Sequence, residues 1–192
     1  MTDKEKIKLF EKELNYISSE DIKNFVKNML TKLPDYFYEI SASSTGKYHP
    51  SYTLGKGGLV RHTKAAVGIA NELKNIMEFE DSEFDSCIAA LILHDGCKNG
   101  RNGDAGDYTM FTHPLEMVEL IKDNSEETSQ IKLICDLIST HMGQWTYNKF
   151  TKKEELRKPE TELEYFVHMC DYLASRKQIE YKFETEVIYG TW

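Results

Sequence analysis

A run of apolar residues that ends in a histidine and an aspartate most constrains the fold of this chain. Residues 87–93 read Cys-Ile-Ala-Ala-Leu-Ile-Leu and lead directly into His94 and Asp95. A helix this apolar is expected to be buried, and an imidazole and a carboxylate are costly to bury without a partner. A bound metal ion is the natural partner, because both groups are good metal ligands. We therefore expect further ligands on neighbouring helices.

Apolar residues recur at spacings of three and four along most of the chain, which is typical of amphipathic helices. This pattern predicts an all-α fold, a helical bundle with the site between core helices. A single domain is expected, with N-terminal helices and a loop over residues 1–56, a core over 57–177 and a tail over 178–192. Weak alternation from Phe183 to Trp192 allows a short strand there. The apolar stripes run over Ile7–Ile17, Ile22–Leu33, Leu59–Ile76, Phe84–Leu91, Leu115–Ile121, Ile131–Ile138 and Leu163–Leu173.

The bulk composition narrows the classes of partner. The 192 residues are 40% hydrophobic and 29% charged, which suits one domain with one core. The net charge of -8 disfavours binding of long nucleic acid, but a local metal site still suits a small anionic ligand. The charged N-terminus and the short apolar runs predict no membrane association. Four cysteines without a CxxC pair favour free thiols and a cytoplasmic location, whereas the oligomeric state stays open.

Six polar residues interrupt the apolar stripes or stand at their ends. Each one alone has an ordinary explanation as a satisfied core residue. Together they fall on successive helices, which favours one shared ligand shell, and they are numerous enough for two metal ions that share a carboxylate. The six residues are His62, His94, Asp95, His113, His141 and Asp171.

The order H…HD…H…H…D resembles the HD-domain superfamily of metal-dependent phosphohydrolases. The resemblance covers roughly residues 57–177. Gly96-Cys97 departs from it, since many members have Ile-Gly there, which changes the local turn without removing a ligand. The matching motifs are Gly57-Gly58-Leu59-Val60-Arg61-His62-Thr63, His94-Asp95 followed by Lys98, Thr112-His113-Pro114 and Cys170-Asp171-Tyr172-Leu173-Ala174.

The resemblance implies two divalent metal ions, with iron or manganese foremost and other transition metals possible. Asp95 would bridge them, and Asp95 and Lys98 would be the catalytic residues. The first ion would be held by His62, His94, Asp95 and Asp171, and the second by Asp95, His113 and His141.

Cationic residues near the expected site are candidates for contact with a phosphate. Lys98 and Arg101 follow the His-Asp pair, while Lys47 and His49 lie in a loop rich in Ser, Gly and Pro. Each of the four is also compatible with a solvated surface group. Aromatic residues at Tyr48, Trp145 and Tyr147 suit base stacking as well as packing, and His168 suits orienting Asp171 or packing.

The function implied by the resemblance is hydrolysis of a phosphate ester or anhydride of a nucleotide or related small molecule. One alternative is a 3′-5′ exoribonuclease-like phosphodiesterase, which the acidic balance disfavours. A second is a mixed-valent di-iron oxygenase of the same superfamily, which the ligand set alone does not separate from a hydrolase. A third is a sensing module without catalysis, which an intact ligand set disfavours.

Overall fold

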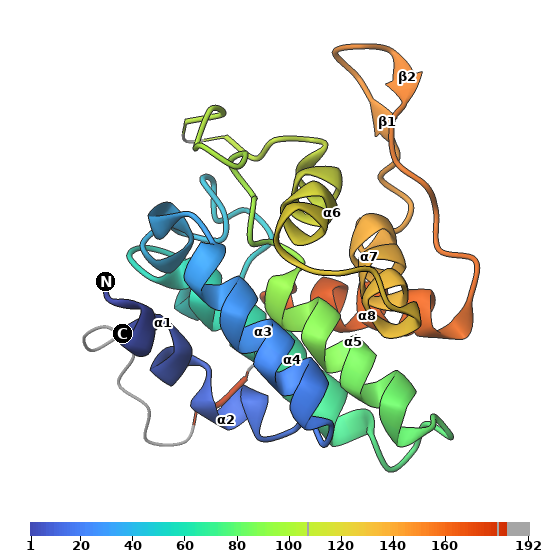
Figure 1. Ribbon diagram of the computed structural model, residues 1–192. Helices are drawn as coiled ribbons and strands as arrows, with labels where there is room; N and C mark the ends of the chain where they lie inside the picture. The colour runs from blue at the N-terminus through green and yellow to red at the C-terminus, as the bar shows by residue number, and fades with distance from the viewer. Residues whose placement is uncertain (107, 180, 184–192) are drawn as a thin grey trace.

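The chain forms a bundle of helices with one small hairpin (Figure 1), which confirms the all-α prediction. The computed structural model describes residues 1–106, 108–179 and 181–183. Most of the tail for which a short strand was allowed therefore lies outside the described residues. The helices are α1 (Asp3–Leu9), α2 (Glu11–Leu14), α3 (Glu20–Lys32), α4 (Gly58–Leu73), α5 (Asp81–Leu93), α6 (His113–Asn124), α7 (Ser129–Thr140) and α8 (Glu162–Ala174), with 3-10 turns at Asp35–Tyr38 and Ser51–Thr53.

Side chains with a hydroxyl group begin several of these helices. Ser19 accepts a hydrogen bond from the Ile22 amide at the start of α3. Thr161 and Glu164 form a reciprocal capping box at the start of α8. The single helix expected from Ile7 to Ile17 is wrong, because the fully buried Phe10 leaves the helical conformation (φ −109°, ψ 18°) and separates α1 from α2.

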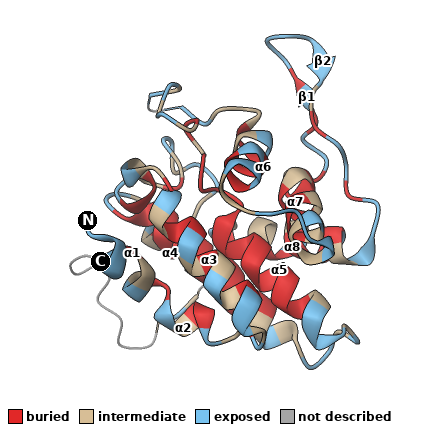
Figure 2. Cartoon of the chain, in the orientation of Figure 1, coloured by how far each residue is buried: buried red, intermediate tan, exposed pale blue. Residues whose placement is uncertain are grey.

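Helix α5 runs through the centre of the bundle, and from Phe84 to Leu93 it is buried on every side (Figure 2). It packs against α3, α4, α7 and α8, and α4 also packs against α8. A helix that is apolar all round is stable only inside a core, so the expected burial of residues 87–93 is confirmed. Two residues assigned to core-facing stripes are exposed: Ile76 lies beyond the end of α4, and Leu115 lies in the first turn of α6.

A short hairpin projects from the body between α7 and α8 (Figure 1). Its strands β1 (Tyr147–Asn148) and β2 (Lys153–Glu154) are antiparallel, with Tyr147 opposite Glu154. Phe150 at its tip is 96% exposed. Among the described residues, no helix has both the length and the apolar character to cross a bilayer.

Candidate metal centre

The six polar residues predicted as ligands converge on one point between the core helices. Each comes from the end, the start or the face of a different helix, apart from the adjacent pair that follows α5. The four histidines and Asp95 are at most 3% exposed, and the Asp171 side chain is 18% exposed. The set is His62 on α4, His94 and Asp95 after α5, His113 at the start of α6, His141 after α7 and Asp171 on α8.

One half of the cluster combines two imidazoles with a carboxylate on α8. His62 Nε2 lies 2.9 Å from Asp171 Oδ1, and His94 Nε2 lies 3.5 Å from the same oxygen. His94 Nε2 also lies 3.6 Å from Asp95 Oδ2. Both His94 Nε2 and His62 Nδ1 are buried without a hydrogen-bond partner. The His94 Nδ1 bond to the Leu91 carbonyl leaves a lone pair on Nε2, which faces both carboxylates and which a cation would satisfy, so this half fits a metal ion.

The other half joins His113 and His141 to the second oxygen of Asp95. His113 Nε2 lies 3.0 Å from Asp95 Oδ1 and 3.1 Å from His141 Nε2. His141 Nε2 lies 3.9 Å from Asp95 Oδ1. Two nitrogens bound to one ion at right angles, each at roughly 2.1 Å, would lie about 3 Å apart. The spacing of the two imidazoles therefore suits a shared ion.

Asp95 lies between the two halves and turns one carboxylate oxygen toward each. Ligand atoms that lie within 4.8 Å of one another form two groups, His62–His94–Asp171 and His94–Asp95–His141. The second group contains His94, where the resemblance implied His113. His113 is nevertheless close to both Asp95 and His141. His94 belongs to both groups and therefore borders both halves.

Main-chain carbonyls fix the orientation of three of the four rings. The Nδ1 atoms of His94, His113 and His141 each hydrogen-bond to the carbonyl three residues earlier, at 2.7–2.8 Å. His94 and His141 follow the last turns of α5 and α7, where main-chain carbonyls are available to accept from a side chain. Such a bond selects the tautomer that leaves Nε2 available as a ligand.

Burial and nearby charges shift the pKa values of His94 and His141, one in each half, in opposite directions. Burial acts to lower the pKa of His94, but the carboxylates of Asp95 and Asp171 raise it above its usual 6.5. Burial and the neighbouring histidines lower the pKa of His141 to about 3. Burial acts to raise the pKa of Asp95, yet Lys98 and His94 hold it well below its usual 3.8. Both carboxylates are therefore ionised at neutral pH, as metal ligands must be.

Two glycines let the backbone close around the cluster. A Cβ at Gly58 would overlap the Thr53 carbonyl, so the loop before α4 packs directly on the first turn of this helix. Gly143 has φ +62°, and a Cβ there would overlap the His168 ring. His168 Nδ1 hydrogen-bonds to the His141 carbonyl at 2.7 Å. His168 thus supports the end of α7; the sequence leaves open whether it orients Asp171 or packs.

Two of the four predicted phosphate contacts lie beside the cluster. Lys98 Nζ lies 2.6 Å from Asp95 Oδ2, and its side chain is only 12% exposed. The His49 ring lies 5.9 Å from the His62 ring. Burial, followed by the nearby charges of His62 and Lys98, lowers the pKa of His49 to about 4. His49 is therefore neutral at physiological pH.

The other two predicted contacts have partners elsewhere. Arg101 forms an ion pair with Asp123 of α6 at 2.6 Å. Lys47 Nζ lies 5.0 Å from the centre of the Tyr48 ring. The charge of Arg101 is thus already paired, and Lys47 belongs to an aromatic group at the surface.

Two further residues hold the loops of the site and were missed from the sequence. Arg61 is 3% exposed and donates to the Leu54 and Lys56 carbonyls at 2.8 Å, which ties down the segment before α4. Tyr36 accepts from the Asn99 amide and donates to the Gly100 carbonyl, which anchors the loop after Asp95. Arg61 lies off the apolar stripe that begins at Leu59, so the helical spacing did not single it out.

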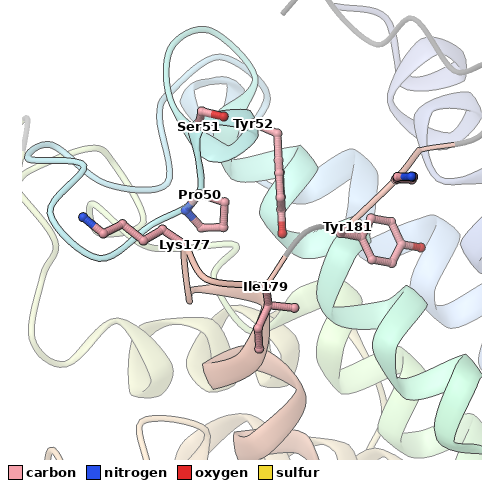
Figure 3. A pocket seen from close by; sticks show the side chains of 7 residues that line it. Pro50, Ser51, Tyr52, Lys177, Ile179 and Tyr181 are labelled. Atoms are coloured by element: carbon pink, nitrogen blue, oxygen red, sulfur yellow. The ribbon is translucent and has the colours of Figure 1, made fainter.

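A surface pocket of about 250 Å³ lies beside this region but contains none of the six residues (Figure 3). Pro50 and Tyr52 line one side, and Lys177, Ile179 and Tyr181 line the other. The Lys177 amide donates to the Tyr48 carbonyl at 2.8 Å. The pocket therefore lies where the loop before α4 meets the segment after α8.

Comparison with known families gives a match that covers the whole cluster. The family model described as HD domain matches residues 59–176, more than half of the chain. Comparison with curated proteins finds no match, and comparison with solved structures finds none. HD domains bind divalent metals and are mostly metal-dependent hydrolases. The matched range, the helical fold and the buried His/Asp cluster agree, and the chain belongs to the HD domain family.

Proposed function

We propose that this protein is a phosphohydrolase with a binuclear metal centre that cleaves a phosphate ester or anhydride of a nucleotide or related small molecule. The observation that carries the proposal is the placement of Asp95. Its Oδ1 faces His113 and its Oδ2 faces His94, at 3.0 and 3.6 Å. A carboxylate with imidazoles at both oxygens suits a bridge between two cations.

The residues that would hold the two ions fall into the two halves of the cluster described above. His62, His94 and Asp171 would hold one ion, His113 and His141 the other, and Asp95 both. When bound, such ions lower the pKa of water and offset the charge of a phosphoryl group. Neutral imidazoles and ionised carboxylates give each half a donor set that suits iron, manganese or other transition metals.

Lys98 would bind the anionic substrate. Its ammonium group cannot ligate a metal while charged, and it lies against Asp95 in the centre itself. A phosphate group drawn to the centre would meet this positive charge, which would help to offset the negative charge of the oxygens. His49 lies beside His62 and would donate or accept one hydrogen bond as a neutral imidazole.

Metal analysis followed by an activity panel tests the proposal. Purified protein would be assayed for bound metal, reloaded with manganese, cobalt or iron, and incubated with nucleotide mono-, di- and triphosphates. We expect phosphate release without consumption of oxygen. Asp95→Ala should abolish it, and Asp123→Asn, which removes an exposed carboxylate from α6, should leave it unchanged. Oxygen uptake by the iron-loaded protein without phosphate release would favour the oxygenase alternative instead.

A further inference from the structure

A row of alternating aromatic and cationic side chains lies on the surface next to the metal centre. The Arg176 guanidinium lies between two rings, 4.4 Å from the centre of Tyr172 and 5.5 Å from that of Tyr48. Trp145 stacks on Tyr172 with ring centres 5.9 Å apart and an angle of 18° between the ring planes. Lys47 lies 5.0 Å from the Tyr48 ring centre. We call these five residues the aromatic ladder.

The ladder is built from three segments that are distant in sequence. Tyr48 comes from the loop before α4, Tyr172 from α8, and Trp145 from the turn that follows α7. Tyr48 is 54% exposed and Trp145 is 44% exposed. Rings packed only for stability are usually buried more deeply than this, because their stabilisation grows with the apolar area removed from water. The arrangement therefore leaves ordered aromatic surface available to a ligand.

Each ring of the ladder is connected to a residue of the metal centre by sequence adjacency or through one intermediate residue. Tyr48 precedes His49, whose ring lies 5.9 Å from that of His62. Tyr172 follows Asp171. Trp145 contacts His168, with ring centres 6.0 Å apart, and His168 hydrogen-bonds to the carbonyl of His141. The ladder is thus the rim of the same site.

We propose that the aromatic ladder binds the base of a nucleotide whose phosphate lies at the metal centre. This inference rests on the proposed function and narrows its substrate to phosphates that carry an aromatic base. Exposed π faces stack on any base, and the charges of Arg176 and Lys47 favour an anionic ligand. Ser175 Oγ accepts from Arg176 Nε and Nη2 at 3.1 and 2.8 Å, which holds the guanidinium in its place between the rings.

Fluorescence titration tests the binding of a base directly. The chain has two tryptophans, so a Trp192→Phe background leaves Trp145 as the sole reporter. AMP and ribose 5-phosphate would each be added to the purified protein, since they share a phosphate and a sugar and differ by the base. We expect saturable quenching by AMP and none by ribose 5-phosphate. Equal responses to the two compounds would overturn the inference.

Kinetics separate the inference from the proposed function. In the unmodified protein we expect kcat/KM to be higher for AMP than for ribose 5-phosphate. Tyr48→Leu and Trp145→Leu should each reduce this ratio roughly 5- to 150-fold, the effect of removing one stacking contact. Tyr165→Leu, which removes an exposed ring two turns earlier on α8, is the matched control and should keep the ratio. Helix content by circular dichroism and bound metal would establish that the variants are folded.

The base site and the phosphohydrolase proposal would fail with different experimental results. Hydrolysis of both compounds at the same rate, or an unchanged ratio in both variants, would leave the phosphohydrolase proposal standing and refute the base site. Saturable quenching by AMP that Tyr48→Leu abolishes, without hydrolysis of any phosphate compound, would support the base site and refute the phosphohydrolase proposal.

Discussion

The two halves of the metal centre are built from the same residue types but differ in charge. The half on α4 and α8 places His94 beside two ionised carboxylates, which raise its pKa. The half on α6 and α7 places His141 among other imidazoles, which together with burial lower its pKa to about 3. Identical side chains therefore acquire opposite proton affinities from their neighbours alone. We expect the carboxylate-rich half to bind a divalent ion more tightly, because it offers two negative charges.

Removal of Asp95 should erase the difference between the halves. This carboxylate contacts both of them, so Asp95→Ala should empty both metal positions and lower kcat/KM by more than roughly a thousandfold. Metal analysis after gel filtration measures the first effect. Asp123→Asn is the matched control, and full metal content in Asp95→Ala would contradict the bridging role.

Removal of a single histidine should separate the halves. His141→Ala should lower the metal content from two ions per chain toward one, because Asp95, His62, His94 and Asp171 remain for the other ion. His62→Ala should leave only the half on α6 and α7 to bind a metal ion, so the overall affinity for metal should fall further than in His141→Ala. Titration with manganese, followed calorimetrically, distinguishes the two variants. A content of one ion in the unmodified protein under excess metal would refute the binuclear interpretation.

The pH dependence of stability should differ in sign between the halves in protein freed of metal. The pKa of His141 is about 3 when folded and 6.5 when exposed, so its contribution is full above pH 6.5 and declines as the pH falls toward 3. The slope is about 1.4 kcal/mol per pH unit. The raised pKa of His94 acts oppositely, since its contribution is full below pH 6.5 and is lost as the pH rises through the folded value.

Chemical denaturation at a series of pH values checks this prediction. The unmodified protein should lose stability as the pH falls from 6.5 to about 4.5, and His141→Gln should make this loss roughly 2–3 kcal/mol smaller. His94→Gln should instead flatten the loss above pH 6.5. Parallel pH profiles for the two variants would show that the halves do not differ as described.

Lys98 tests whether the centre acts on phosphate. Lys98→Ala should leave the metal content unchanged and lower kcat/KM by roughly one to two decades, the effect of losing one charge-assisted contact of about 1.5–3 kcal/mol. A loss in kcat would mean that the contact tightens in the transition state, and a loss in KM would mean ground-state binding. Lys98→Arg keeps the charge and should retain more activity. Unchanged kinetics in Lys98→Ala would assign this lysine to the support of Asp95.

Arg101 should have the smallest effect among the cationic candidates. Because its guanidinium already pairs with Asp123 at 2.6 Å, Arg101→Ala should change kcat/KM by less than about threefold. Steady-state kinetics beside Lys98→Ala measure the contrast. A loss as large as that of Lys98→Ala would mean that the loop after Asp95 rearranges when substrate binds.

The helices and the convergence of the six polar residues could be predicted from the sequence, because both follow from the spacing of residues along helices. His62 and His141 continue apolar stripes, and residues on such stripes must face the core. The ion pair of Lys98 with Asp95 and that of Arg101 with Asp123 could not be predicted, since they depend on the path of an irregular loop. The break at Phe10 was missed because its apolar spacing also fits an unbroken helix.

The hydrogen bonds from His94, His113 and His141 to main-chain carbonyls have a consequence for the kinetics of metal release. Since α5 and α7 hold two of these rings through their own last turns, each ring keeps its orientation for as long as that turn stays wound. Fraying of a helix end would release a ligand, whereas replacement of nearby side chains would leave it in place. The rate at which a chelator strips the metal should therefore follow the hydrogen exchange of amides at these two helix ends.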